Sequence, residues 1–187
     1  WVWHQLLGHA RTTPMPHAFW GPEFSDGDHK AALAAKGLAF REVADPPAVA
    51  ARLLAESKII GWFQGRAEIG PRALGARSIL ASPLSPDMQQ RLNEIKDRED
   101  FRPVAPVVLE EEAASWFRGA RVSPFMLFVN DVAADKAERI PAVRHVDGTA
   151  RIQTINRAQN PRYYDLVRAF QRRTGVPVLV NTSFNTR

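Results

Sequence analysis

The stretch GWFQGRAEIGPRALGARSILASPLSPDMQQRLNEIKDREDFR, residues 61–102, decides how the rest of this chain is interpreted. Its middle, residues 64–78, holds three arginines, one glutamate and three glycines; we call it the arginine-rich loop. Glycine lets a backbone approach a ligand closely, and the planar arginine side chain binds two oxygens of a carboxylate or phosphate. The residue types therefore predict an anion-binding loop. The alternative is a surface loop tied by ion pairs.

Length and composition are those of one globular domain. The chain has 187 residues, of which 45% are hydrophobic and 24% charged. The sequence shows no apolar run that could span a bilayer and no signal-peptide pattern, so we expect no membrane partner. Cysteine is absent, which excludes disulfides and thiolate metal sites. Its absence fits a reducing compartment, and the location we expect is cytoplasmic.

The basic charge balance predicts an anionic partner. The formal charge is +5 and the pI about 10.1. Nucleic-acid surfaces spread their basic residues along a face, whereas the arginines here cluster in motifs. We therefore favour small phosphorylated molecules over nucleic acid. A basic RNA-binding module is the alternative from a different class.

Helices and strands are predicted to intermix along the chain. We expect helices at residues 25–36, 45–57, 86–95, 110–117 and 160–175. We expect strands at residues 38–43, 58–63, 78–81, 104–109, 124–129, 151–155 and 176–180. The order lacks a strict βαβ rhythm. It predicts an α/β (α+β) fold, an open twisted mixed β-sheet with packed helices.

End signals and periodicity refine these elements. Four residues have the chemistry of helix N-terminal caps: Ser25, Asp45, Ser85 and Asn160. Gly175 is expected to end the last helix. Met88, Leu92 and Ile95 share one face of the third helix and are expected in the core. The run PFMLFV at 124–129 predicts a buried strand.

A cluster of cations follows the third helix. Lys96, Arg98 and Arg102 stand close together around its end, a spacing suited to holding a dianion. The alternative for Lys96 is a favourable charge at a helix C-terminus.

Two later segments are candidates for the same site. Asn181-Thr182-Ser183-Phe184-Asn185 follows a strand with short polar side chains, although such residues also form simple turns. Alternation in residues 151–155 places Arg151 and Gln153 on one face of a strand, which is unusual unless that face lines a site. Both segments therefore predict polar contacts to an anion.

A metal or dinucleotide site is not indicated. His145 and Asp147 are potential ligands, but no third candidate stands near them, so we expect no metal. Asp147-Gly148 has the residues of a tight turn, and His145 is expected to be structural. The sequence holds neither a P-loop nor a dinucleotide fingerprint.

Four ordered blocks carry a resemblance to a known family. The runs QGRAEIGPRALGARSILASP, LNEIKDREDFRPVAP, HVDGTARIQT and GVPVLVNTSFN resemble the C-terminal domain of the NodU/CmcH-type carbamoyltransferases. The earlier segment PMPHAFWGPEFSD is similar to the family's approach to this domain. The resemblance implies a YrdC-like domain over residues 21–187, truncated at its C-terminal end. Residues 1–20, beginning with the end of a helix at 1–11, are expected to be the end of an upstream domain and a linker.

What the family does is then expected of this chain. The resemblance implies that the domain binds ATP, with magnesium, and carbamoyl phosphate, and forms carbamoyl-adenylate. A separate N-terminal domain with a metal site would pass the carbamoyl group to an acceptor hydroxyl. That domain is the expected protein partner, and a homodimer is an option. The runner-up is a threonylcarbamoyl-adenylate synthase, which should lack the GPRALG block present here.

The resemblance also implies roles for single residues. Lys96, Arg102 and Arg151 are the expected catalytic residues and are assigned to carbamoyl phosphate. Substrate or nucleotide contacts are expected from Arg72, Arg77, Arg98, Gln153, Asn181, Ser183 and Asn185. Within that set Asn181 is assigned near the carbamoyl phosphate, and Arg98, Ser183 and Asn185 to the nucleotide phosphates. Glu68 is expected to orient an arginine.

Overall fold

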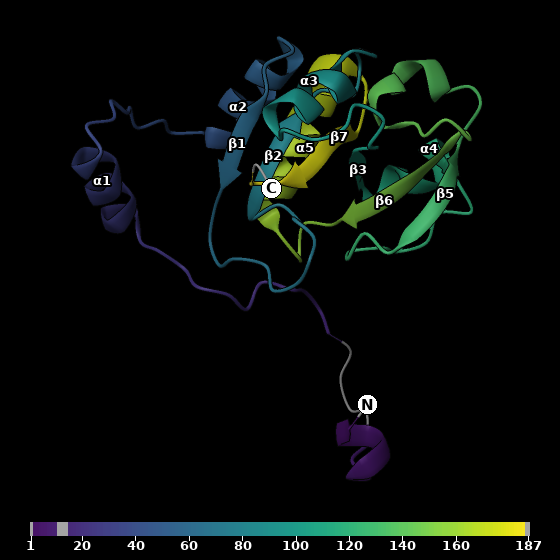
Figure 1. Cartoon of the computed structure of the whole chain (residues 1–187), viewed down its shortest axis with the longest axis horizontal. Helices are drawn as coiled ribbons and strands as arrows, with labels where there is room; N and C mark the ends of the chain where they lie inside the picture. Colours follow the sequence, from purple (N-terminus) through teal and green to yellow (C-terminus); the bar gives the residue numbers. More distant parts are fainter. Residues whose placement is uncertain (1, 11–14, 186–187) are drawn as a thin grey trace.

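The structure is a computed structural model that describes residues 2–10 and 15–185. The predicted helix end at 1–11 and linker at 11–21 lie partly outside this range. Residues 186 and 187 lie wholly outside it. Residues 2–6 form a single π-helical turn, η1 (Val2–Leu6). Residues 15–45, which we call the N-terminal arm, run along the outside of the body, and their helix α1 (Asp26–Ala35) buries no residue (Figure 1).

A seven-stranded mixed sheet forms the centre of the molecule, which confirms the predicted fold class (Figure 1). Its order is β1-β2-β7-β3-β6-β5-β4. Strands β3 and β6 pair in parallel, and the other described pairings are antiparallel. The strands are β1 (Ile60–Phe63), β2 (Arg77–Ala81), β3 (Ala105–Leu109), β4 (Phe117–Arg118), β5 (Phe128–Val132), β6 (Thr149–Ile155) and β7 (Val178–Ser183).

Helices cover the sheet where their sequence signals predict them. Helices α2 (Pro46–Ala55) and α5 (Pro161–Thr174) pack against each other and against the sheet. The remaining helical elements are α3 (Met88–Ile95), α4 (Ala113–Trp116) and the 3-10 turns η2 (Glu110–Glu112), η3 (Ala137–Arg139) and η4 (Pro141–Val143). None of the helices in the described ranges combines the length and apolar character needed to cross a bilayer.

Three predicted caps are confirmed by their hydrogen bonds. Ser25 forms a capping box with Asp28 at the start of α1, and the Asp45 carboxylate accepts the Ala48 N–H at α2. Asn160 accepts the Tyr163 N–H at 3.1 Å, which fixes the start of α5. Gly175 ends α5 in the left-handed conformation, with φ of 72°.

The cap predicted at Ser85 is wrong. Helix α3 begins three residues later, because the Ser85 carbonyl accepts the Met88 N–H in a turn and the Ser85 hydroxyl bonds Asp87. Met88 and Leu92 are buried as expected, but Ile95 is 49% exposed. Asn93 is the buried residue in the last turn of α3 instead. Its amide donates to the carbonyls of Asp100 and Arg102, which follow the helix.

Two predicted strands are wrong. Residues 38–43 pair with no strand and lie exposed in the arm. The apolar run 124–129 is mostly a turn, in which Met126 has a positive φ of 55°, and β5 starts only at Phe128. Leu127, Phe128 and Val129 are exposed, because beyond β5 only the two-residue strand β4 continues the sheet. At the other end, β7 runs past the predicted limit of residue 180 to Ser183.

Gly75 lies where the arginine-rich loop meets the core. Its φ is +104°, and a Cβ built there would stand 2.1 Å from Cδ1 of the fully buried Tyr163. The Tyr163 ring has no room to move aside, because it is packed between the loop and the sheet core. Gly70 also has a positive φ, of +131°, but no atom lies within 4 Å of a Cβ built there. A substitution at Gly70 therefore adds backbone strain without a steric clash.

We therefore predict that Gly75→Ala destabilises the fold more than Gly70→Ala. Both substitutions strain the backbone by ~1–3 kcal/mol. Only Gly75→Ala adds overpacking, which typically costs ~1–3 kcal/mol more. Urea unfolding of the two variants measures the difference. Equal free energies of unfolding would contradict the proposed contact with Tyr163.

Candidate functional site

The carboxylate of Glu68 holds the arginine-rich loop from within. Its Oε1 accepts three backbone N–H bonds, from Leu74 at 2.7 Å, Ala76 at 2.8 Å and Arg77 at 3.2 Å. Glu68 was expected to orient an arginine; these three hydrogen bonds all come from backbone N–H groups, one of them that of Arg77. A carboxylate that accepts several N–H groups fixes a loop that has no regular backbone pairing of its own.

Two buried amides hold the same loop against the sheet. Asn181 on β7 donates to the Ala73 carbonyl at 2.9 Å, and Gln153 on β6 donates to the Leu74 carbonyl at 3.0 Å. Asn181 also donates to Gln153 Oε1 at 2.7 Å, so the two side chains act as one unit. They are 1% and 3% exposed. Both were predicted to contact ligand, and the structure shows their amide donors bound to the loop.

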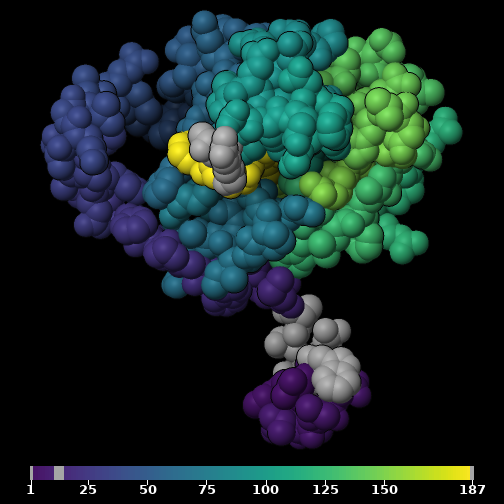
Figure 2. All heavy atoms as spheres, viewed as in Figure 1, coloured from purple at the N-terminus to yellow at the C-terminus, as the bar shows by residue number. Residues whose placement is uncertain are grey.

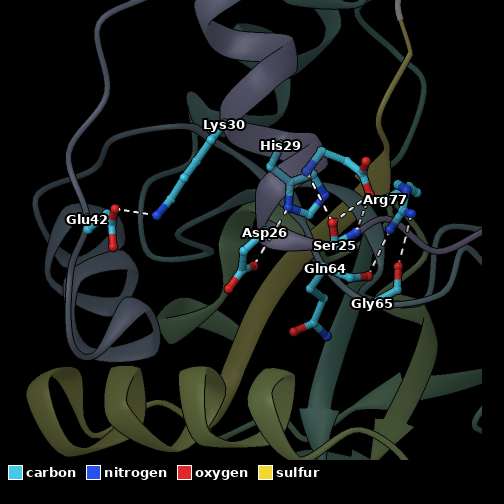
Figure 3. A network of polar contacts seen from close by, with 9 residues as sticks. Ser25, Asp26, His29, Lys30, Glu42, Gln64, Gly65 and Arg77 are labelled. Carbon is cyan, nitrogen blue, oxygen red and sulfur yellow. Dashed lines mark hydrogen bonds and ion pairs between the residues drawn. The ribbon is translucent and has the colours of Figure 1, made fainter.

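Arg77 is bound entirely within the protein. Its guanidinium donates to the carbonyls of Gln64 and Gly65 at 2.8 and 3.0 Å (Figure 3). It also donates to the Ala76 carbonyl at 2.9 Å and lies 3.5 Å from the Phe63 ring centroid. Burial lowers the pKa of this guanidinium, and the charge of Glu68 opposes that shift. The Arg77 carbonyl accepts the Phe184 N–H at 3.2 Å, between the predicted site residues Ser183 and Asn185, but Arg77 lines neither of the two cavities described below.

Three other guanidinium groups meet in a small space beneath the loop, which we call the inner cavity. Its volume is about 120 Å³, and Arg72, Arg98 and Arg151 line it. The polar side chains Asn181, Thr182 and Ser183 complete its wall, and no carboxylate lies among its lining residues. Burial, followed by the charge of Arg72, lowers the pKa of Arg151; burial, followed by the charge of Arg102, lowers that of Arg98.

Polar atoms in this wall lack partners. Within residues 2–10 and 15–185, the buried atoms Arg98 Nη2, Arg151 Nε and Asn181 Oδ1 accept or donate no hydrogen bond. Buried charged groups are normally paired, because an unpaired buried charge is costly. Arginines that repel one another around a shared cavity form an arrangement that suits an anion.

A wider space, which we call the outer cavity, adjoins the first. It has a volume of about 720 Å³ and shares Arg98 and Ser183 with the inner cavity. Its lining residues are Lys96, Asp97, Arg98, Glu99, Arg102, Ser183 and Asn185. The structure thus brings Lys96 and Arg98 together with Ser183 and Asn185, which lie far away in the sequence.

Lys96 organises the end of β7. Its ammonium donates to the carbonyl and hydroxyl oxygens of Ser183, at 2.7 and 3.2 Å, and to both oxygens of Asn185, at 2.7 and 3.0 Å. These acceptors are neutral, and the side chain is only 4% exposed. Burial first, and the charge of Arg98 second, lower the pKa of Lys96 to about 8.

Arg102 stands at the rim of the outer cavity. It is exposed and pairs with the Glu99 carboxylate at 2.6 Å. Sequence reasoning missed Asn93, which is fully buried and accepts a 2.6 Å bond from Arg98 Nε. A buried asparagine in the apolar face of α3 was the available signal, since such a group needs a polar partner.

His145 and Asp147 form the expected turn. The Asp147 carboxylate accepts bonds from Thr149, and the His145 ring lies 3.0 Å from the Thr149 hydroxyl. Burial lowers the pKa of His145. Among the residues that the structure describes, no three His, Cys, Asp or Glu side chains gather as a metal site would require.

Comparison with known proteins shows the family of this chain. The model of the family described as "Carbamoyltransferase C-terminus" matches residues 51–187, and the chain belongs to that family. The chain is 45% identical over 180 residues to nodulation protein NolO of Bradyrhizobium diazoefficiens, covering 91% of this chain and 32% of that protein. It is 47% identical over 132 residues to 3'-hydroxymethylcephem-O-carbamoyltransferase of Amycolatopsis lactamdurans, covering 71% and 25%.

A solved structure supports the fold. The crystal structure of full-length HypF in the phosphate- and nucleotide-bound form matches 78% of this chain and 18% of its own, with a TM-score of 0.51 and 18% identity. This likeness concerns the fold alone. The chain spans roughly a quarter to a third of the length of the curated relatives it matches.

We predict that Glu68→Gln loosens the loop. Glutamine keeps an acceptor oxygen but loses the charge, and hydrogen bonds to charged groups are worth ~1 kcal/mol more than neutral ones. We expect the free energy of unfolding to fall by ~1–2 kcal/mol. Amide hydrogen exchange at Leu74, Ala76 and Arg77 should accelerate. Glu138→Gln, at a largely exposed carboxylate, is the matched control; unchanged exchange in Glu68→Gln would refute the role.

We also predict a pH dependence that arises from Lys96. The ammonium loses its proton as the pH rises through about 8, so the outer cavity loses a positive charge and binds dianions more weakly above that pH. Sulfate is a suitable probe because its own charge stays constant. Calorimetric titrations from about pH 7 to about pH 9.5 should show falling affinity in the native protein.

The control for this prediction is Lys96→Arg. Arginine stays protonated over this range, so its sulfate affinity should be nearly independent of pH. A fall of the same size in both proteins would assign the pH dependence to another group.

Proposed function

We propose that this chain is the carbamoyl-activating domain of an O-carbamoyltransferase. It would bind carbamoyl phosphate and ATP and form carbamoyl-adenylate for transfer to an acceptor hydroxyl. The observation that carries the proposal is the inner cavity, which is lined by Arg72, Arg98 and Arg151 and by no carboxylate, and in which Arg98 and Arg151 each keep one buried donor atom without a partner. Membership of the carbamoyltransferase C-terminus family supplies the chemical class.

The proposed reaction has two steps. Carbamoyl phosphate and one water give carbamate and inorganic phosphate. A carbamate oxygen then attacks the α-phosphorus of ATP, the bond from that phosphorus to the bridging oxygen breaks, and pyrophosphate leaves. Both steps bring polyanions together, so fixed cations must offset their repulsion and stabilise the charge that develops at phosphorus.

The geometry favours a partition between the two cavities. The inner cavity, at about 120 Å³, has room for a small anion such as carbamoyl phosphate among Arg72, Arg98 and Arg151. The outer cavity, at about 720 Å³, has the size of a nucleotide site. This partition assigns Lys96 and Arg102 to the nucleotide. The resemblance implied instead that both bind carbamoyl phosphate together with Arg151. Arg98 and Ser183 line both cavities and would contact both substrates.

Magnesium and the protein partner follow from the same proposal. The described residues hold no cluster of three metal-ligating side chains, so magnesium would arrive bound to the ATP phosphates and keep most of its waters. Magnesium would add charge neutralisation at the phosphates. Transfer to the acceptor would need a further domain with its own metal site, and the relatives are three to four times as long as the matched region.

The first test is calorimetric titration of carbamoyl phosphate and of ATP, with Arg151→Gln and Lys96→Met as variants. Arg151→Gln should weaken carbamoyl phosphate binding at least about tenfold, about 1.4 kcal/mol, and ATP binding less. Lys96→Met should show the opposite preference. Arg157→Gln, which removes only an exposed pair with Asp165, is the matched control.

Two results would contradict the proposal. One is carbamoyl phosphate binding that survives Arg151→Gln unchanged in the folded protein. The other is weak, non-saturating binding of both ligands together with tight RNA binding that falls steeply with salt, which would favour the RNA-binding alternative. Pyrophosphate release that requires ATP and carbamoyl phosphate together would test the adenylate step directly.

A further inference from the structure

A further cavity lies away from the cationic site. It has a volume of about 810 Å³ and opens between the N-terminal arm, the end of β1 and the start of α5. We call it the arm cavity. It shares no lining residue with the inner or outer cavity. The arginine-rich loop contributes Gly65 and Arg66 to the arm cavity and Arg72 to the inner cavity.

The loop and the arm build this cavity together. The Gly21 N–H donates to the Ala67 carbonyl at 2.9 Å, and the Ala67 N–H donates to the Pro22 carbonyl at 2.9 Å. The Ile69 N–H donates to the Ala18 carbonyl at 2.8 Å. The arm is therefore hydrogen-bonded to the loop along this edge, and the space between arm and sheet is a feature of the fold.

Aromatic rings form one wall of the arm cavity. Phe24 lies 6.4 Å from Phe63 between ring centroids, and His29 meets the Phe63 ring edge-on at 5.5 Å (Figure 3 shows His29 above Gln64). Trp20 stands beside His17 at 4.7 Å. The Arg77 guanidinium covers one face of Phe63, whereas Phe24 is 48% exposed and lines the cavity, and an exposed aromatic ring suits a planar ligand.

Polar atoms without partners lie in the same wall. Among the described residues, Trp62 Nε1, Gln64 Oε1 and His29 Nε2 are buried and form no hydrogen bond. The Gln64 amide is 8% exposed, and its Nε2 donates to the carbonyl of Gly75 and to Asn160 Oδ1, which leaves Oε1 free to accept. An indole donor and an amide acceptor two residues apart in an extended segment match a ring edge that carries one acceptor and one donor.

The charges disfavour a phosphate here. Glu23 and Asp26 line the cavity with carboxylates, whereas Arg66 already donates to the carbonyls of Gly21 and Trp20. Arg162 is the other cation of the wall. The arm cavity therefore differs from the inner cavity, whose lining residues include three arginines and no carboxylate.

We propose that the arm cavity is a second binding site, for an uncharged planar nitrogen heterocycle of about nucleoside size. The ring would stack on the aromatic wall and exchange hydrogen bonds with Trp62 and Gln64. A volume of about 810 Å³ lies within the range of small-molecule sites. This proposal stands apart from the carbamoyl-activating function and does not depend on it.

Adenosine is the probe that tests it, because it has the ring but no phosphate. Trp20 and Trp62 line the cavity, so tryptophan fluorescence should change saturably on titration, and equilibrium dialysis should give the same dissociation constant. Phe24→Ala should weaken adenosine binding about five- to a hundredfold, as loss of one stacking ring does. Phe101→Ala, at an exposed phenylalanine outside the cavity, should leave it unchanged.

Three outcomes would overturn the proposal. The first is no saturable binding of adenosine by dialysis. The second is equal binding in the native protein and Phe24→Ala. The third is loss of adenosine binding in Lys96→Met, because the base would then occupy the outer cavity, to which the proposed function assigns the nucleotide. Retention of adenosine binding in Lys96→Met supports the second site even if the proposed carbamoyl phosphate binding fails.

Discussion

The hydrogen bond between the side chains of Asn181 and Gln153 is the contact on which the rest of the site depends. It joins β7 to β6 across β3, and the two amides then hold the carbonyls of Ala73 and Leu74. Because Arg72 directly precedes Ala73, this contact sets how far its guanidinium stands from Arg151 on β6. Glu68 fixes the same loop from its other side, so the wall of the inner cavity is determined before any ligand arrives.

The arginines of this region differ in whether their guanidinium groups find hydrogen-bond partners within the protein. Arg77 is surrounded by carbonyl oxygens and an aromatic ring, so its charge is satisfied within the protein. Arg98 and Arg151 keep buried nitrogen atoms without partners among the described residues, and the positive charges of Arg102 and Arg72 lower their respective pKa values, opposed at Arg98 by Glu99. Such an arrangement costs stability, and the core built on β3, β7 and α5 offsets that cost.

The sequence predicted best what local chemistry determines. Caps at Ser25, Asp45 and Asn160 appear as expected, because a cap needs only its own side chain and the N–H groups that follow. The run PFMLFV failed, because burial of a strand depends on what lies beside it, and here the sheet nearly ends. The cations of the site were predicted from residue type. The loop contacts of Gln153 and Glu68 were not, because the same groups bind a ligand or a backbone equally well.

Arg98 explains why one cluster of cations can serve two anions in the proposed reaction. Its Nε is held by the buried Asn93, which sets the guanidinium between the inner and outer cavities. Two anions on either side of one fixed cation repel each other less than they would in its absence, and neither must displace the other to be held. Carbamate released in the inner cavity would then lie next to the nucleotide phosphates, separated by a side chain and not by solvent. A short-lived intermediate requires that proximity, and the shared wall of Arg98 and Ser183 is the feature of this fold that supplies it.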